Sequence, residues 1–144
     1  MIRRKDKKRV NVAVKVDLAN YKDVVAATIG LLQPEKIRRA RLSGVVSPAA
    51  SMLALPEKVA IRLGVPVVGK VKVGYANHRI ATRKRVQDVW LRIQGRDGVF
   101  SAILEPRRST VRIGSIVIDF LDFMVDYDSR RLRPRHPKGI VVEL

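Results

Sequence analysis

The sequence predicts an all-β domain, folded as a closed barrel with a few short helices. Short apolar segments alternate with polar residues at period two, β-branched residues are frequent in them, and Gly, Pro, Asn and Asp separate them at close spacing. A length of 144 residues suits one domain of this kind and is too short for two full domains. We therefore expect a basic N-terminal arm at residues 1–9 and a single domain at residues 10–144.

The N-terminal half alternates predicted strands with two short helices. Residues 10–18 carry apolar, mostly β-branched side chains at every second position, which is typical of a strand. Asn20 is suited to cap a helix at 21–28 and Gly30 to close it, because Asn accepts a hydrogen bond from the first turn and Gly adopts left-handed backbone. The segments that follow, in order, are a turn at 33–36, an extended segment at 37–46, an apolar run at 51–55, and a helix from Pro56 that ends at Gly64.

The C-terminal half is predicted to consist mainly of hairpins. Strands are expected at 67–73 and 80–93, and the turn between them at 76–78, since Asn77 tolerates positive φ. The remaining segments, in order, are a turn at 95–98, a strand at 99–104, a loop at 106–110, a short buried helix at 115–121, a strand at 123–127, a turn at 128–130 and an extended tail at 140–144.

Composition narrows the possible functions. The formal net charge is +17, from 30 Lys and Arg against 13 Asp and Glu, which indicates a polyanionic or acidic partner. The chain has no Cys, only two His and no glycine-rich phosphate loop, so we expect no disulfide, no metal and no cofactor. No apolar run approaches the length of a membrane span and no secretory signal is visible, so we expect a cytoplasmic protein without membrane contact.

Several motifs, in order along almost the whole chain, resemble the retropepsin-like aspartic peptidases. The segment 46–56 resembles the family's active-site loop, and Leu63-Gly64-Val65-Pro66 resembles the end of the helix that follows it. The resemblance continues with a flap at Tyr75, Ala76, Asn77 and His78, a turn at Gly95-Arg96, a second apolar-Gly element at Arg112, Ile113 and Gly114, and closing strands at 121–126 and 131–134. It implies the acid-protease fold, a homodimer and a peptide-binding groove.

The sequence departs from the family at the centre of the site. Ser47 stands where the family has its catalytic Asp, Pro48 where it has Thr and Ala49 where it has Gly, so the loop Ser47, Pro48, Ala49 and Ala50 is degenerate. The family mechanism needs two carboxylates that share one proton and thereby have separated pKa values. A serine hydroxyl cannot replace a carboxylate as a general base. The resemblance therefore implies a catalytically inactive homodimer.

An active peptidase with a non-standard site remains an alternative. Ser47 could act as a nucleophile only with a base in hydrogen-bond reach, and His78 on the flap is the candidate. The competing interpretation of His78 is an exposed turn residue. A cluster of acidic residues near the C-terminus is interpreted as counter-ions for the Arg-rich strands rather than as a metal site: Asp119, Asp122, Asp126 and Asp128.

The basic residues suggest a further alternative, a nucleic-acid-associated module on the same scaffold. Clustered cations neutralise phosphates, whereas the competing interpretation is a solvated basic surface, and few aromatic residues accompany the clusters for base stacking. The candidate patches are Arg3, Arg4, Lys5, Lys7, Lys8 and Arg9 in the arm, Arg79, Arg83, Lys84 and Arg85 around the flap, and Arg130, Arg131, Arg133, Arg135 and Lys138 near the C-terminus.

A homodimer is also expected from apolar surface that one chain leaves uncovered. We expect this surface around Val45, Val46 and Ile113 and along a C-terminal strand at 140–144. A twofold contact would bury the same patch on both subunits. A peptide or an acidic protein is the expected partner of the groove.

Overall fold

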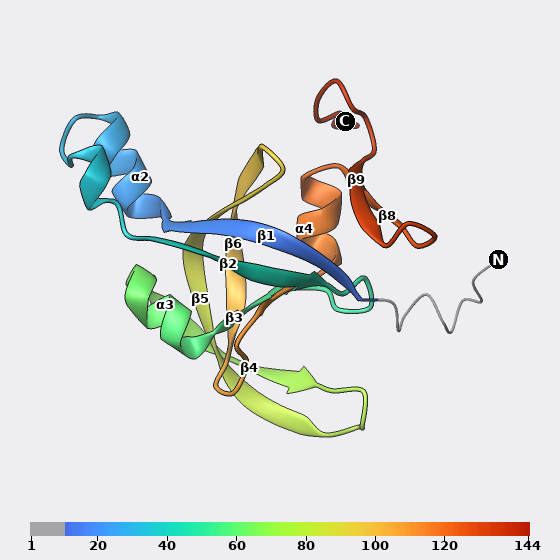
Figure 1. The fold of residues 1–144 in the computed structure, drawn as a ribbon. Helices are drawn as coiled ribbons and strands as arrows, with labels where there is room; N and C mark the ends of the chain where they lie inside the picture. Colours follow the sequence, from blue (N-terminus) through green and yellow to red (C-terminus); the bar gives the residue numbers. More distant parts are fainter. Residues whose placement is uncertain (1–10) are drawn as a thin grey trace.

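A six-strand barrel forms the centre of the structure, a computed structural model that describes residues 11–144 (Figure 1). The barrel is closed because its first strand pairs with a neighbour along each edge. Most neighbouring strands are antiparallel and two pairs are parallel, so the prediction of an all-β barrel with a few short helices is confirmed. The strand order around the barrel is β1 (Val12–Asn20), β2 (Arg39–Val46), β7 (Val111–Ile113), β3 (Leu53–Pro56), β6 (Arg96–Glu105) and β5 (Ile80–Ile93).

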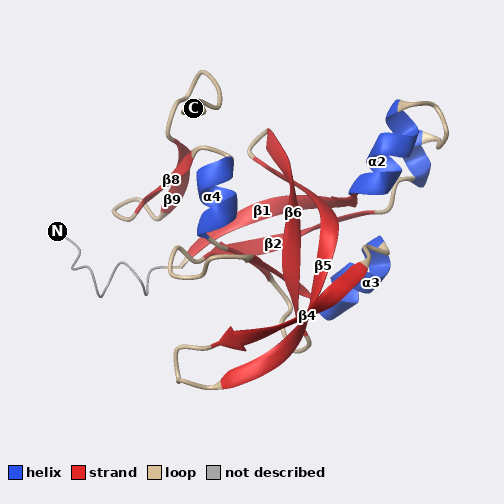
Figure 2. Ribbon diagram, turned by 180° about the vertical axis from the view of Figure 1, so that it is seen from behind, coloured by secondary structure: helices blue, strands red, loops and turns tan. Residues whose placement is uncertain are grey.

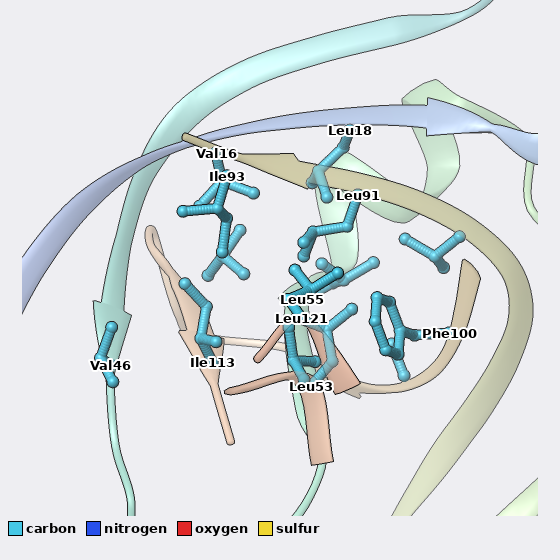
Figure 3. Packing of buried hydrophobic residues seen from close by; sticks show 14 of the residues in the cluster. Val16, Leu18, Val46, Leu53, Leu55, Leu91, Ile93, Phe100, Ile113 and Leu121 are labelled. Atoms are coloured by element: carbon cyan, nitrogen blue, oxygen red, sulfur yellow. The ribbon is translucent and has the colours of Figure 1, made fainter. Parts of the chain in front are cut away.

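The barrel interior is filled by aliphatic side chains from every wall (Figure 3). Alternation along each strand sends one set of side chains inward, as the period-two pattern predicts. Removing these side chains from water is the main favourable term in folding. Fully buried residues include Val16, Leu18, Val46, Leu53, Leu55, Leu91, Ile93, Ile113 and Leu121.

A long hairpin projects from the barrel. β5 is 14 residues long, and its C-terminal half belongs to the barrel while its N-terminal half pairs with β4 (Val67–Gly74). β4 has no other strand neighbour among the described residues, so the two strands leave the barrel as a two-stranded arm (Figures 1 and 2). This arm is the hairpin that the sequence predicts to be the flap.

Two short helices follow the signals in the sequence. α2 (Tyr21–Thr28) begins after Asn20, whose side chain accepts a hydrogen bond from the Asp23 N–H, as expected for an N-cap. The same Asn20 amide donates to the Leu63 carbonyl oxygen at 3.0 Å and so ties α2 to α3 (Glu57–Leu63). Gly64 ends α3 in left-handed conformation, with φ at 66°. The turn before β2 is a 3-10 helix, η1 (Pro34–Lys36).

The C-terminal elements cover one end of the barrel. They are α4 (Ser115–Phe120) and a separate two-stranded sheet of β8 (Phe123–Asp126) and β9 (Arg131–Pro134) (Figure 2). Arg96 at the start of β6 donates hydrogen bonds to the carbonyl oxygens of Leu121 and Asp122, which fixes this unit to the barrel.

Three local predictions are wrong. The turn expected at 95–98 is a two-residue turn at Gln94 and Gly95, both with positive φ, which suits a tight hairpin and lets β6 begin at Arg96. At the flap tip the residue with positive φ is His78 rather than Asn77. The tail at 140–144 forms no strand, because the Val141 N–H donates to the Asp122 carboxylate instead of to a neighbouring strand.

Candidate functional site

The degenerate loop is a β-turn between β2 and β3. Ser47 and Ala50 close it, since the Ala50 N–H donates to the Ser47 carbonyl oxygen at 3.0 Å. Serine at the first position and proline at the second are favourable for a type I turn, so this sequence suits the local backbone. The Ser47 N–H donates to the Ile113 carbonyl oxygen at 2.9 Å, which anchors the loop to β7. The half-buried Ser47 side chain makes no hydrogen bond with any residue of the described chain.

Gly114 holds the other end of this loop in place. Hydrogen bonds join Ser115 N–H to the Ala50 carbonyl oxygen and Ile116 N–H to the Ser51 carbonyl oxygen. A Cβ on Gly114 would lie 2.5 Å from the Met52 carbonyl oxygen, closer than backbone atoms allow. Gly114 therefore lets two backbone segments meet, and Ile113, the other residue that the resemblance indicates, is buried in the core and accepts the Ser47 N–H at its carbonyl oxygen.

The hairpin arm presents one apolar and one basic face. Cross-strand pairs place Val71 opposite Arg83 and Val73 opposite Ala81, and all four of these residues are half-buried. The intervening pairs, Lys70 with Lys84 and Lys72 with Thr82, are exposed. The face with Val71 and Val73 is thus turned toward the barrel.

A cleft of about 660 Å³ lies between this face and the degenerate loop. Its lining includes Ser47 and Ala49 on one side and Val71 and Val73 on the other. Its floor is the outer face of the barrel, where the pairing of β3 with β6 and β7 brings Ala54, Ile103 and Arg112 together. Of the residues that the sequence assigns to the loop and the flap, five line this cleft and three do not: Ser47, Ala49, Ala50, Tyr75 and Ala76 line it, and Pro48, Asn77 and His78 do not.

A hydrogen-bonded network ties the hairpin to the rim of the cleft. The Tyr75 hydroxyl donates to Glu105 at 2.6 Å and accepts from the Arg83 Nε at 3.0 Å. Arg83 also lies 3.8 Å from the Glu105 carboxylate and stacks over the Tyr75 ring. This network was not predicted, because its members are far apart in the sequence.

Neither histidine is bonded to Ser47. His78 is exposed at the hairpin tip, as its turn interpretation predicts, and makes no hydrogen bond to Ser47. His136 follows β9 in the C-terminal unit, and its Nδ1 lies 2.6 Å from the Asp122 carboxylate rather than near Ser47. No Ser–His pair is therefore formed within residues 11–144.

Three of the four residues in the acidic cluster pair with basic residues, as predicted, whereas Asp128 forms no ion pair within the described chain. Asp119 pairs with Arg135 at 3.5 Å, and Asp126 with Arg133 at 2.9 Å. The hydrogen bond from His136 lowers the pKa of the buried Asp122 carboxyl, which also lies near Arg96. In the part of the chain that the structure describes, no three acidic or histidine side chains are placed to hold a metal ion.

The three basic patches have different surroundings. The arm residues Arg3, Arg4, Lys5, Lys7, Lys8 and Arg9 lie outside the described residues. In the flap patch, Arg83 is bound to Glu105, whereas Lys84 points to the opposite face of the hairpin and pairs with Glu57 at 3.4 Å. In the C-terminal patch, Arg130 and Arg131 are exposed while Arg133 and Arg135 have the acidic partners given above.

Sequence reasoning missed a fourth basic patch on the barrel wall, which we call the Trp90 patch. It surrounds a shallow cavity of about 360 Å³ where β1, β2 and β5 meet. Arg41 pairs with Asp17 at 3.5 Å, and the other arginines have no acidic partner among the described residues. These residues are far apart in the sequence, and the strand register together with the position of α3 places them around one cavity, which the sequence alone does not reveal: Arg39, Arg41, Arg62, Arg92 and Trp90.

The exposed apolar surface differs in part from its prediction. Val46 and Ile113 are fully buried in the core, so the expectation that they lie on uncovered surface is wrong. Successive side chains of a strand point to opposite faces, so Val46 and Ile113 point into the barrel while their chain neighbours Val45 and Arg112 point outward. Other exposed large apolar residues are spread over the described chain, and one group of them lies on α4, β8 and the tail: Ile116, Phe120, Met124, Ile140, Val141, Val142 and Leu144.

Comparison with known proteins gives no match to a protein-family model or to a curated protein. No helix between residues 11 and 144 has the length and apolar character that a membrane crossing requires. The cleft and its charges are therefore the basis for inferring function.

Proposed function

We propose that the chain is a catalytically inactive, homodimeric relative of the retropepsin-like aspartic peptidases that binds peptides in the cleft beneath the β4–β5 hairpin. The observation that carries the proposal is the cleft of about 660 Å³ between the degenerate loop and the hairpin. Apolar walls at Val71, Val73 and Ile103 suit peptide side chains, and a concave site of this size is typical for ligands.

Loss of catalysis follows from the chemistry of the cleft. Ser47 offers a neutral hydroxyl at the position where the family has a carboxylate. The carboxylate that does line the cleft, Glu105, is bound by Tyr75 and Arg83. A lone carboxylate engaged in this way cannot share a proton with a second one, which the family mechanism requires.

A dimer is supported by the uncovered apolar face on α4, β8 and the tail. Phe120 and Ile116 expose more than half of their surface, and the tail residues lie beside Phe120 around a common cavity. Isolated monomers rarely expose so many neighbouring large apolar residues. A twofold contact through this face would cover them on both subunits.

Peptide binding is tested with two tryptophan substitutions on the same hairpin. Val73→Trp fills the cleft from its wall, whereas Thr82→Trp adds the same side chain on the exposed opposite face. Each protein is titrated with a fluorescent library of end-blocked octapeptides. We expect saturable binding to wild type and Thr82→Trp, and at least about tenfold weaker binding to Val73→Trp. Equal binding to all three proteins, or none to wild type, would refute the proposal.

A second candidate function, nucleic-acid binding, is favoured by the Trp90 patch. Unpaired arginines can bind phosphates, and the half-buried Trp90 is the one tryptophan available beside them. The test is affinity for a random single-stranded oligonucleotide at two salt concentrations. We expect affinity to fall steeply with salt, and Arg39→Gln with Arg92→Gln to reduce the slope by about 0.7 for each phosphate that the variant no longer neutralises. No detectable binding at low salt would exclude this function.

A further inference from the structure

Arg112 on the floor of the cleft has a buried hydrogen-bond donor without an acceptor. It lies on β7, between Val45 of β2 and Ala54 of β3, and faces outward from the barrel. Its Nε is buried and unpaired, and no other side-chain nitrogen or oxygen between residues 11 and 144 is in that condition. A buried donor is normally paired, because leaving it unpaired costs free energy. Arg112 also forms no ion pair within the described chain.

A second guanidinium strengthens the positive charge at this position. Arg108, in the loop before β7, is half-buried. Burial lowers the pKa of Arg108, and the nearby charge of Arg112 lowers it further. Arg108 nevertheless stays protonated near neutral pH, as arginines do in proteins. Arg108 does not line the cleft, and its Nε donates to the Thr110 carbonyl oxygen at 3.5 Å, so Arg112 is the guanidinium that the cleft itself presents.

The acidic residue nearby does not neutralise this pair. Glu105 accepts a hydrogen bond from Tyr75 at 2.6 Å, and its other oxygen faces Arg83 at 3.8 Å. The adjoining cavity of about 460 Å³ adds Arg79 and Arg107 and no further carboxylate from the described residues. The cleft and its extension therefore carry an excess of positive charge that the described chain leaves uncompensated.

We propose that the cleft selects peptides with an Asp or Glu side chain, whose carboxylate binds Arg112. A carboxylate accepts two parallel N–H bonds from a guanidinium, and the terminal nitrogens of Arg112 make no hydrogen bond within the described chain. The apolar walls at Val71 and Ile103 favour a peptide over a nucleic acid, because a peptide backbone is neutral, whereas every phosphate of a nucleic acid that lies against these walls would lose water. This inference rests on the proposed peptide-binding function and specifies its ligand.

The test compares octapeptides that differ by one charge. The probes are acetylated and amidated octapeptide pools in which one position is fixed as Glu or as Gln, so that no terminal carboxylate is present. We expect at least one Glu pool to bind wild type about tenfold or more tightly than its Gln counterpart. Arg112→Gln should reduce this ratio to about one, and Arg112→Lys, which keeps the charge but not the planar fork, should give an intermediate ratio.

A control separates a specific site from general charge. Lys58→Gln removes one positive charge from an exposed position on α3 outside the cleft, and it should leave the Glu-to-Gln ratio unchanged. An unchanged ratio in Arg112→Gln would overturn the inference. Equal binding of Glu and Gln pools to wild type would overturn it while leaving peptide binding intact. No binding of either pool would overturn the proposed function and this inference together.

Discussion

Gly114 shows how one residue can determine the shape of the cleft. Its missing side chain lets the backbone at Ser51 and Met52 approach α4, and any Cβ there would lie 2.5 Å from the Met52 carbonyl oxygen. A side chain at position 114 would push the backbone of Ser51 and Met52 away from α4, and the loop that lines the cleft would move with it. The sequence indicates this position through its resemblance to a family, but only the packing explains it.

Gly114→Ala is therefore expected to lower the free energy of unfolding by about 1–3 kcal/mol, since the crowded backbone must shift. Gly74→Ala is the matched control, because a Cβ at Gly74 meets no atom within 4 Å. The control should change stability by less than about 0.5 kcal/mol. Urea denaturation of both variants measures the difference. Equal stability of the two variants would show that the close approach at Gly114 does not exist.

Asp122 gives the fold a specific dependence on pH. The hydrogen bond from His136, followed by one from the Val141 N–H and the charge of Arg96, holds its pKa below the ordinary value of 3.8. A lowered pKa in the folded state means that the charged carboxylate stabilises the fold above about pH 4 and that this stabilisation is lost as pH falls toward the folded pKa.

Asp122→Asn is expected to be less stable than wild type near neutral pH, because it removes the charge from a buried ion pair. The difference should shrink as pH falls below about 4. Urea denaturation across this range checks it, with Asp119→Asn as control, since Asp119 is exposed and its pair with Arg135 contributes little. A stability difference that stays constant with pH would contradict the account.

Local signals explain why some elements could be predicted from sequence and others could not. α2 has the predicted bounds, because an Asn N-cap and a closing Gly act within a few residues. β7 has only three residues, and its position depends on partners on β2 and β3 that no local pattern reveals. The same holds for the site: the loop and the hairpin could be predicted from motifs, whereas the Tyr75–Glu105–Arg83 network and the Trp90 patch arise from strand register.

The tail is the element whose prediction failed most clearly. Residues 140–144 are apolar enough for a strand, yet they have no strand neighbour within the described chain. A partner edge on a second subunit would supply one, in keeping with the proposed dimer. An unpaired extended segment of this kind is well suited to pairing between chains.

Two serine substitutions test the role of the tail in assembly. Ile140→Ser with Val142→Ser should weaken the dimer, because both side chains lie on the uncovered apolar face. Leu31→Ser with Ile61→Ser removes two exposed apolar side chains elsewhere and should leave the dimer intact. Sedimentation velocity at micromolar concentration distinguishes them. A monomeric wild-type protein under these conditions would rule out the proposed homodimer.

At the scale of the molecule, the net charge of +17 is distributed among sites with different properties. Some arginines are neutralised by acidic partners, as at Asp122 and Glu105. Within residues 11–144, others have no such partner, among them Arg112 in the cleft and the arginines of the Trp90 patch other than Arg41. The total charge could be predicted from composition, but its division between a cleft and a barrel surface depends on the fold.

The central claim is that the cleft binds peptides without cleaving them. The most direct test incubates pure protein with the octapeptide library at about pH 4 and about pH 7, where paired carboxylates and other bases would act, and analyses bound and free peptides by mass spectrometry. We predict that the protein retains peptides and that every retained peptide is recovered at full length. Pepstatin-sensitive cleavage products from the wild-type protein would contradict the account.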